Sequence, residues 1–278
     1  MRLGVSKNLG YEDPKEWALQ MKKLGCGSVV FPIDYTGGEE VIWEYVKAAR
    51  ENGLVIAEVG VWCNPLSENE EERNAAIRKC KGQLRLADEI GANCCVNVAG
   101  TRGAWWAGAY KENFSSQTWD ETVRVIQEII DEVQPKSTYY TVEPMPAMYP
   151  MNPDQYLELI RCVNRERFAV HMDLFNWITD PRKYFFHETF MEECFDKLGG
   201  YIKSCHLKDV SLQKEATFQL REVPCGDGEL NLETYARLAE KCNPDMTMII
   251  EHLPSKEAYI ESMKYVSERF RKAGITLE

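Results

Sequence analysis

This chain is constrained most by an alternation of short apolar segments and longer amphipathic segments, which repeats eight times between residues 3 and 273. The short segments are expected to form strands and the longer ones helices. The expected strands are Leu3–Ser6, Ser28–Phe31, Val55–Trp62, Asn93–Val98, Thr138–Glu143, Phe168–Asp173, Tyr201–Leu207 and Met246–Glu251. The expected helices are Pro14–Gly25, Glu39–Asn52, Glu70–Ile90, Gln117–Val133, Pro153–Val163, Arg182–Leu198, Leu232–Lys241 and Ser255–Ala273.

Eight strand–helix units joined by short connections predict a parallel (β/α)₈ TIM barrel. A doubly wound open sheet would show the same alternation, but a count of eight is the number that closes a barrel of this kind. No linker rich in Pro, Ser or Gly divides the chain, so we expect a single domain over residues 1–278.

The net charge and the cysteine pattern argue against several classes of function. A formal charge of −11 predicts a poor nucleic-acid binder, because contacts with phosphates need a basic surface. The ten cysteines include no CxxC pair, which indicates reduced thiols and predicts a cytoplasmic protein. No apolar run has the length of a signal peptide or a membrane span, so no membrane association is expected.

The segment Ile202–Asp209 indicates where the polar side chains point. Alternation along a strand places Ser204, His206 and Lys208 on one face. The strands before and after this segment end in acids, namely Glu143, Asp173 and Glu251. In a barrel the apolar faces of the strands pack against the helices, so the polar faces point to the axis. These side chains would then meet at the C-terminal ends of the strands, where barrel enzymes place their active sites.

Three carboxylates and one imidazole at the same barrel mouth require compensation, because burying like charges together is costly. Three oxygen donors and one nitrogen donor suit one divalent cation: Mn²⁺ or Mg²⁺ first, with Zn²⁺ or Co²⁺ as alternatives. We therefore predict that Glu143, Asp173, His206 and Glu251 bind one such ion, with Mn²⁺ favoured. Taken alone, His206 is explained as a hydrogen-bonded core histidine, and each glutamate as a loop-facing charge. The hypothesis rests on all four at equal depth on consecutive strands.

Other polar and aromatic residues are predicted to lie near the same mouth. The candidate substrate-binding residues are Glu58, Trp62, Trp106, His171, Asn176 and Lys208. Lys208 would neutralise an oxyanion, hold a substrate hydroxyl or pair with a neighbouring acid. His171 lies one layer deeper than Asp173, which favours a hydrogen-bonding role over metal ligation.

An aromatic loop follows the fourth expected strand, between Gly100 and Ser116. Its residues Trp105, Trp106 and Tyr110 would form a lid that stacks on a sugar or an aglycone. The alternatives are that they pack the loop down or form a subunit interface. No GxGxxG, P-loop or serine-elbow motif is present, so nucleotide use and serine hydrolase chemistry have no support.

The order of the four predicted ligands along the chain resembles that of the xylose isomerase-like barrel superfamily, which includes sugar phosphate isomerases, ketose 3-epimerases and inosose dehydratases. The resemblance spans the whole chain and is carried by Val142-Glu143-Pro144, His171-Met172-Asp173, His206-Leu207-Lys208-Asp209, Gly226-Asp227-Gly228-Glu229-Leu230 and Ile250-Glu251-His252. It implies that the four predicted ligands hold a metal that binds two adjacent sugar oxygens. It also implies that Glu143 and Glu251 act as catalytic acid and base.

Three positions depart from the ketose 3-epimerase pattern. Asn176, Leu212 and Tyr149 stand where those enzymes have a histidine, an arginine and a second glutamate. The substrate clamp of those enzymes is therefore not carried over. A narrower resemblance, at Val5–Tyr11 and Thr217–Gln219, is to the larger subunit of bacterial C-glycoside deglycosidases, which work with a small β-rich subunit.

Three functions remain open from the sequence. The first is a metal-dependent isomerase or epimerase acting on a small carbohydrate by proton abstraction next to a carbonyl. The second is a metal-dependent lyase: a C-glycoside deglycosidase subunit or an inosose dehydratase acting on a 3-oxo sugar. The third is a catalytically silent barrel that binds a partner. The family resemblance implies a homo-oligomer, or a hetero-oligomer with a small β-rich subunit under the deglycosidase hypothesis.

Overall fold

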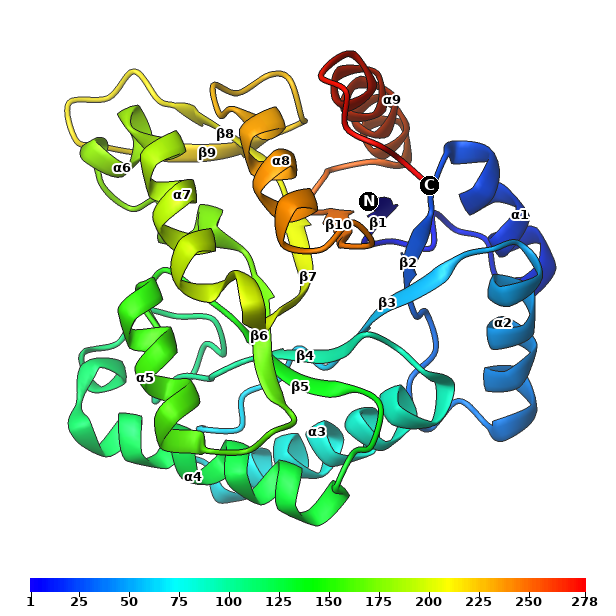
Figure 1. The fold of residues 1–278 in the computed structure, drawn as a ribbon. Helices are drawn as coiled ribbons and strands as arrows, with labels where there is room; N and C mark the ends of the chain where they lie inside the picture. The colour runs from blue at the N-terminus through cyan, green and yellow to red at the C-terminus, as the bar shows by residue number, and fades with distance from the viewer.

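A computed structural model of the chain describes residues 1–278 and contains eight parallel strands that surround an axis and are covered by helices (Figure 1). Along the sheet the strands follow the order β1-β10-β7-β6-β5-β4-β3-β2. Their bounds are β1 Arg2–Val5, β2 Ser28–Val30, β3 Val55–Gly60, β4 Cys94–Val98, β5 Tyr139–Glu143, β6 Phe168–Met172, β7 Ile202–Leu207 and β10 Thr247–Ile250. All the expected strands form, with ends shifted by at most two residues, and the predicted barrel is confirmed.

The seam between β1 and β2 nearly closes the barrel. The Gly27 N–H donates to the Leu3 carbonyl at 2.8 Å, and the Ser28 hydroxyl donates to the Arg2 carbonyl at 3.1 Å. A Cβ atom on Gly4 would lie only 2.5 Å from the Ser28 carbonyl oxygen. A residue without a side chain is therefore needed where the two strands approach most closely.

The helices form where amphipathic segments follow capping residues. Asp13 accepts a hydrogen bond from the Glu16 N–H at 2.8 Å, and Gly25 takes a left-handed conformation at φ 95°, as the sequence predicts. The helices are α1 Pro14–Leu24, α2 Glu39–Glu51, α3 Glu70–Ile90, α4 Ser116–Val133, α5 Pro153–Val163, α6 Pro181–Phe185, α7 His187–Leu198, α8 Leu232–Cys242 and α9 Lys256–Lys272. None of them has both the length and the apolar composition that crossing a bilayer requires.

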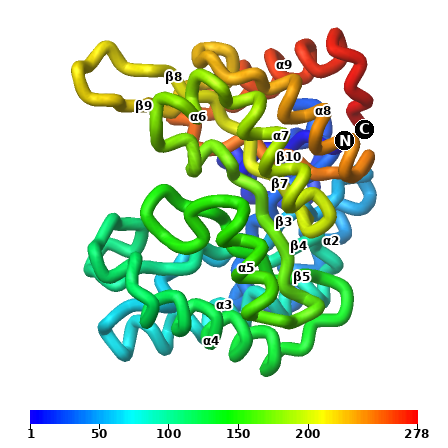
Figure 2. The backbone as a smooth tube through the Cα atoms, turned by 60° about the vertical axis from the view of Figure 1, so that its left-hand side comes forward, coloured from blue at the N-terminus to red at the C-terminus, as the bar shows by residue number.

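The segment after β7 differs from the predicted long loop. It contains an antiparallel hairpin of β8 (Asp209–Leu212) and β9 (Leu220–Val223), which extends beside α6 (Figures 1 and 2). The two strands pair only with each other and lie outside the barrel sheet. They therefore lack the continuous apolar sequence of a strand buried on both faces, which is the signal that predicts a barrel strand. The Leu212 N–H donates to the Tyr184 hydroxyl at 3.2 Å, which attaches the hairpin to α6.

The single helix expected over Arg182–Leu198 is also divided. It begins earlier, at Pro181, and Phe186 leaves the helical conformation at φ −117° and ψ 37° between α6 and α7. The Asp180 side chain caps α6 by accepting from the Lys183 N–H at 3.0 Å. The break lets α6 meet the hairpin while α7 covers the barrel.

The alternation within the strands positions the site as the sequence predicts. On the outer face of β5, the Val142 N–H and carbonyl both hydrogen-bond to the Tyr156 hydroxyl of α5. The inward residues of β3, β6 and β7 meet at the axis, where Glu58 contacts His171 and His206. Glu143 ends β5, while Asp173 and Glu251 directly follow β6 and β10.

The seam gives a direct test of barrel closure. Gly4→Ala would force the new methyl group against the Ser28 carbonyl, and we expect a loss of about 1–3 kcal/mol in the free energy of unfolding. Urea unfolding followed by circular dichroism measures this loss. Gly200→Ala is the matched control, because a Cβ there meets no atom within 4 Å. Equal stability of the two variants would contradict the close approach of β1 and β2.

Candidate metal centre

Four side chains converge at the C-terminal mouth of the barrel. Glu143, Asp173, His206 and Glu251 each present one ligand atom, and these four atoms all lie within 4.8 Å of one another. None of the four residues is more than 4% exposed. The structure thus brings together the residues that the sequence predicts as metal ligands.

The imidazole of His206 lies between two carboxylates. Its Nδ1 is 2.9 Å from Glu251 Oε2 and 3.4 Å from Glu143 Oε1. On the other side of the cluster, Lys208 Nζ lies 2.8 Å from Asp173 Oδ2 and 2.7 Å from Glu251 Oε1. The two cations therefore separate the three carboxylates from one another.

The electrostatics of the cluster follow from this arrangement. Burial, together with the charges of Glu251 and Glu143, raises the pKa of Asp173 well above its usual value, although Lys208 opposes the shift. Burial also acts to raise the pKa values of Glu143 and Glu251, but the charge of His206 holds both below the usual value, and Lys208 adds to this effect at Glu251. Desolvation acts to lower the pKa of His206, but the charges of Glu251, Glu143 and Glu58 outweigh it and raise this pKa well above its usual value. Without a further cation, the cluster thus retains protons.

The donor atoms fit a divalent cation. Asp173 Oδ1 is buried and has no hydrogen-bond partner, while His206 Nδ1 and Glu251 Oε1 have close charged neighbours but no well-oriented hydrogen bond. Buried polar atoms are rarely left in this state. Three carboxylate oxygens and one imidazole nitrogen are a donor set for Mn²⁺ or Mg²⁺. These four residues would hold the ion.

Asn176 and Lys208 support this cluster from one side. The Asn176 amide donates to Glu143 Oε1 at 3.2 Å and to Asp173 Oδ2 at 2.8 Å, and its carbonyl accepts from Lys208 Nζ at 3.2 Å. Of the roles considered for Lys208, the structure displays the ion pair with neighbouring acids. Both residues hold the candidate ligands, and their predicted contact with substrate stays a prediction.

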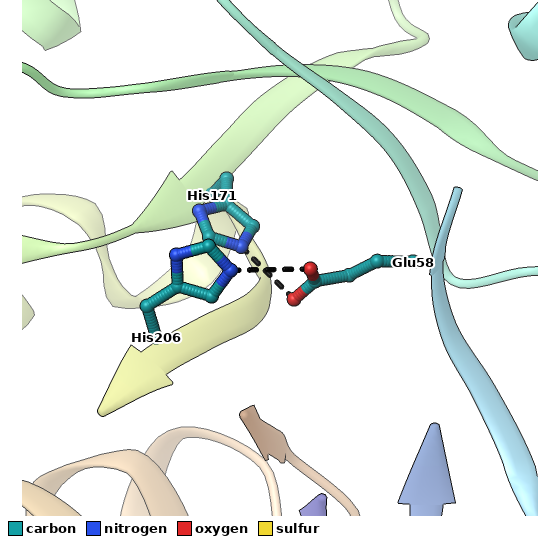
Figure 3. A group of neighbouring side chains, drawn as sticks. All are labelled: Glu58, His171 and His206. Carbon is teal, nitrogen blue, oxygen red and sulfur yellow. Dashed lines mark hydrogen bonds and ion pairs between the residues drawn. The ribbon is translucent and has the colours of Figure 1, made fainter. Parts of the chain in front are cut away.

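Glu58 and His171 form a second layer beneath the cluster. Figure 3 shows their contact with each other and the contact of Glu58 with His206. Glu58 is 0% exposed and bonds His171 Nε2 at 2.9 Å and His206 Nε2 at 3.2 Å. His171 is thus a hydrogen-bonding residue, as the sequence predicts. Glu58 lies below the candidate ligands, and its expected contact with substrate stays a prediction.

Two residues at the rim were not among the predicted site residues. His252, 54% exposed at its side chain, places Nε2 3.5 Å from Glu251 Oε2 and Nδ1 2.9 Å from Glu222 Oε2. Glu222 lies on β9 and also contacts Lys208 Nζ at 3.2 Å. His252 directly follows a predicted ligand, which was the one available signal. Glu222 belongs to the unpredicted hairpin.

The predicted aromatic contacts are only partly at the site. The Trp62 ring lies 6.1 Å from the His206 ring, centroid to centroid, and has a left-handed backbone at φ 50°. Trp106 is 39% exposed in the loop after β4, which is tied to neighbouring loops through Asn113 and Ala147. The loop's role as lid or interface stays a prediction.

The fold and site define a member of a known family. A family profile described as xylose isomerase-like TIM barrel matches residues 19–269. The chain belongs to this family. A comparison with curated proteins found none that matches the sequence.

Several solved structures are similar to this chain. A xylose isomerase-like TIM barrel protein from Mycobacterium smegmatis, in complex with magnesium, matches at 17% identity and a TM-score of 0.68, covering 93% of this chain and 88% of that one. The 3-keto-D-glucoside 4-epimerase YcjR from E. coli matches at 16% identity and 0.69, covering 96% and 99%. The D-psicose 3-epimerase from Clostridium cellulolyticum H10, with D-tagatose, matches at 12% identity and 0.71, covering 98% and 99%. At these identities the likeness establishes the fold alone.

Ion binding at this cluster is predicted to be linked to proton release. His206 and Asp173 have raised pKa values and hold protons that a bound cation must displace. The apparent affinity for Mn²⁺ should therefore increase with pH, by about tenfold per pH unit for each proton released. Titration calorimetry in buffers of different ionisation enthalpy measures the protons released. Binding that is independent of pH and releases none would contradict the site.

Proposed function

We propose that this protein is a divalent-metal-dependent isomerase or epimerase that acts on a carbohydrate. The main support for this proposal is a cluster of four side chains at the C-terminal mouth of the barrel. One ligand atom each of Glu143, Asp173, His206 and Glu251 lies within 4.8 Å of the other three. The family and the sugar epimerases among the similar structures support this class of reaction. Mn²⁺ is the ion we favour, with Mg²⁺ next.

The chemistry requires a carbonyl, an acidic neighbouring C–H and a base. A bound divalent cation would act as a Lewis acid on the substrate carbonyl and a neighbouring hydroxyl. Glu143 and Glu251 enter the cluster from β5 and β10, with β6 and β7 between them in the sheet. They would therefore flank a bound sugar from two sides. One carboxylate would remove the proton beside the carbonyl, and the other, after taking up a proton from solvent, would donate that proton to the opposite face.

The surroundings would maintain these two carboxylates in the ionised form that a base requires. His206 lowers the pKa values of both Glu143 and Glu251. Lys208 lies 2.7 Å from Glu251, and Asn176 donates to Glu143. Asp173, with a raised pKa, is the carboxylate that needs a cation most.

The substrate is proposed to differ from a simple free ketose. Tyr149 donates to the Phe114 carbonyl at 3.0 Å, and Leu212 packs against the core from the hairpin. Asn176 is engaged by the ligand cluster. None of these three residues is therefore proposed to make the substrate contact that the histidine, arginine or glutamate makes at the same position in the ketose 3-epimerases. Trp62 and His252 at the rim are instead the groups that a substrate would meet.

The alternative function is a lyase that uses the same enolisation to expel a group from a 3-oxo sugar. Proton abstraction next to the 3-oxo group would then be followed by loss of water or an aglycone. The product mass separates the two reactions, because an epimerase conserves mass. A silent partner-binding barrel would catalyse neither reaction.

The experiment is a Mn²⁺-supplemented screen of ketoses, inososes and 3-oxo-glycosides in D₂O, followed by mass spectrometry. We expect incorporation of one solvent deuterium into at least one sugar. Glu143→Gln and Glu251→Gln should slow this exchange by about 10²–10⁴-fold, because each removes an acid–base group. Glu261→Gln, on the exposed face of α9, is the matched control and should leave the rate unchanged. Equal exchange by all variants, or none with any sugar, would reject the proposal.

A further inference from the structure

The layer beneath the candidate ligands contains a carboxylate that the proposed reaction does not use. Glu58 is completely buried on β3, and its two oxygens receive three donors. His171 Nε2 lies 2.9 Å and the Ser204 hydroxyl 2.5 Å from Oε1, while His206 Nε2 lies 3.2 Å from Oε2. Figure 3 shows the two imidazoles pointing at this one carboxylate from neighbouring strands.

These contacts determine which nitrogen of His206 carries a proton. An ionised carboxylate only accepts hydrogen bonds, so His206 Nε2 must carry a hydrogen to bond Glu58. Nδ1, on the opposite side of the ring, then offers its lone pair to an ion held by Glu143 and Glu251. The reverse tautomer would place a hydrogen on Nδ1, 2.9 Å from Glu251 Oε2, and would block that ion.

The carboxylate is itself held in a fixed orientation. His171 and Ser204 bond the same oxygen, and Thr247 donates to the Ser204 hydroxyl at 2.9 Å. The His171 ring also stands nearly perpendicular to the His206 ring, at 77° and 4.1 Å between centroids. Rotation of the His206 imidazole is therefore restricted on both sides of the hydrogen bond.

We propose that Glu58 is a positioning residue, which holds His206 as the Nε2–H tautomer and so reserves Nδ1 for a divalent cation. This inference rests on the proposed metal-dependent function and assigns Glu58 a role in metal affinity rather than in substrate contact. Carboxylates that bond the second nitrogen of a ligating histidine act in this way in metal sites generally.

The variant Glu58→Gln reverses the hydrogen bond with little change in shape. A glutamine offers one accepting oxygen and one donating amide. The oxygen is expected on the side of His171 and Ser204, where two donors require it, so the amide faces His206. Nε2 of His206 must then accept, and the remaining proton moves to Nδ1.

Titration calorimetry with Mn²⁺ alone measures the consequence. We expect Glu58→Gln to bind Mn²⁺ about 10- to 100-fold more weakly than the parent protein. Thr122→Val is the matched control: Thr122 is also buried, but it lies on α4 and its hydroxyl donates only to the Thr118 carbonyl of the same helix, so the affinity of this variant should stay within about threefold of the parent. Glu58→Asp keeps an accepting carboxylate and should bind more tightly than Glu58→Gln. Equal weakening in both Glu58 variants would indicate packing damage and overturn the proposal, as would parental affinity in Glu58→Gln.

Long-range ¹H–¹⁵N spectra of histidine report the tautomer without any turnover. In the Mg²⁺-loaded parent, Nε2 of His206 should carry the proton, and in Glu58→Gln it should not. If the parent binds neither ion, the proposed function fails, and the metal-free spectra are then recorded at a pH high enough for His206 to lose one of its two ring protons. Retention of the Nε2 proton in the parent but not in Glu58→Gln would still support the role of Glu58. A parent His206 without a proton on Nε2, or a Glu58→Gln spectrum identical to that of the parent, would overturn the inference.

Discussion

Mutual repulsion among three buried carboxylates is the constraint on which the rest of this structure depends. Glu143, Asp173 and Glu251 lie together at one barrel mouth and are at most 4% exposed, where water screens their charges poorly. His206 and Lys208 are placed between them and offset part of the repulsion. The raised pKa of Asp173 indicates that the compensation is incomplete. A divalent cation held by the proposed ligands would supply the missing positive charge.

The barrel makes this concentration of charge sustainable. Each ligand belongs to a separate strand, and the outward neighbours of the ligands pack against helices, as when Tyr156 of α5 and Tyr235 of α8 bond the backbone of β5 and β6. The backbone therefore cannot move apart to relieve the repulsion. One layer beneath the mouth, the buried carboxylate of Glu58 is likewise compensated, because it accepts hydrogen bonds from three side chains. The packing that stabilises the barrel therefore also holds the three carboxylates together, which a flexible chain would not do.

The barrel and the four converging residues could be predicted from the sequence because both depend on short-range periodicity. Alternation within a strand decides which side chains face inward, and Glu143, Asp173, His206 and Glu251 all obey it. The hairpin β8–β9 could not be predicted, since its strands pair only with each other and attach to α6 through Tyr184. Glu222 and His252 were missed for the same reason: their meeting depends on where the hairpin folds back. The role proposed for Glu58 could not be predicted either, because it depends on how deep the side chain lies in the barrel, and strand periodicity predicts only which way it points.

The central claim is that four side chains share one divalent ion at the mouth of this barrel. Anomalous diffraction at the manganese edge, from crystals soaked with Mn²⁺, tests it most directly. The predicted result is a single strong peak within coordination distance of Glu143, Asp173, Glu251 and Nδ1 of His206. The absence of a peak there, or an ion held at another place by other residues, would contradict it.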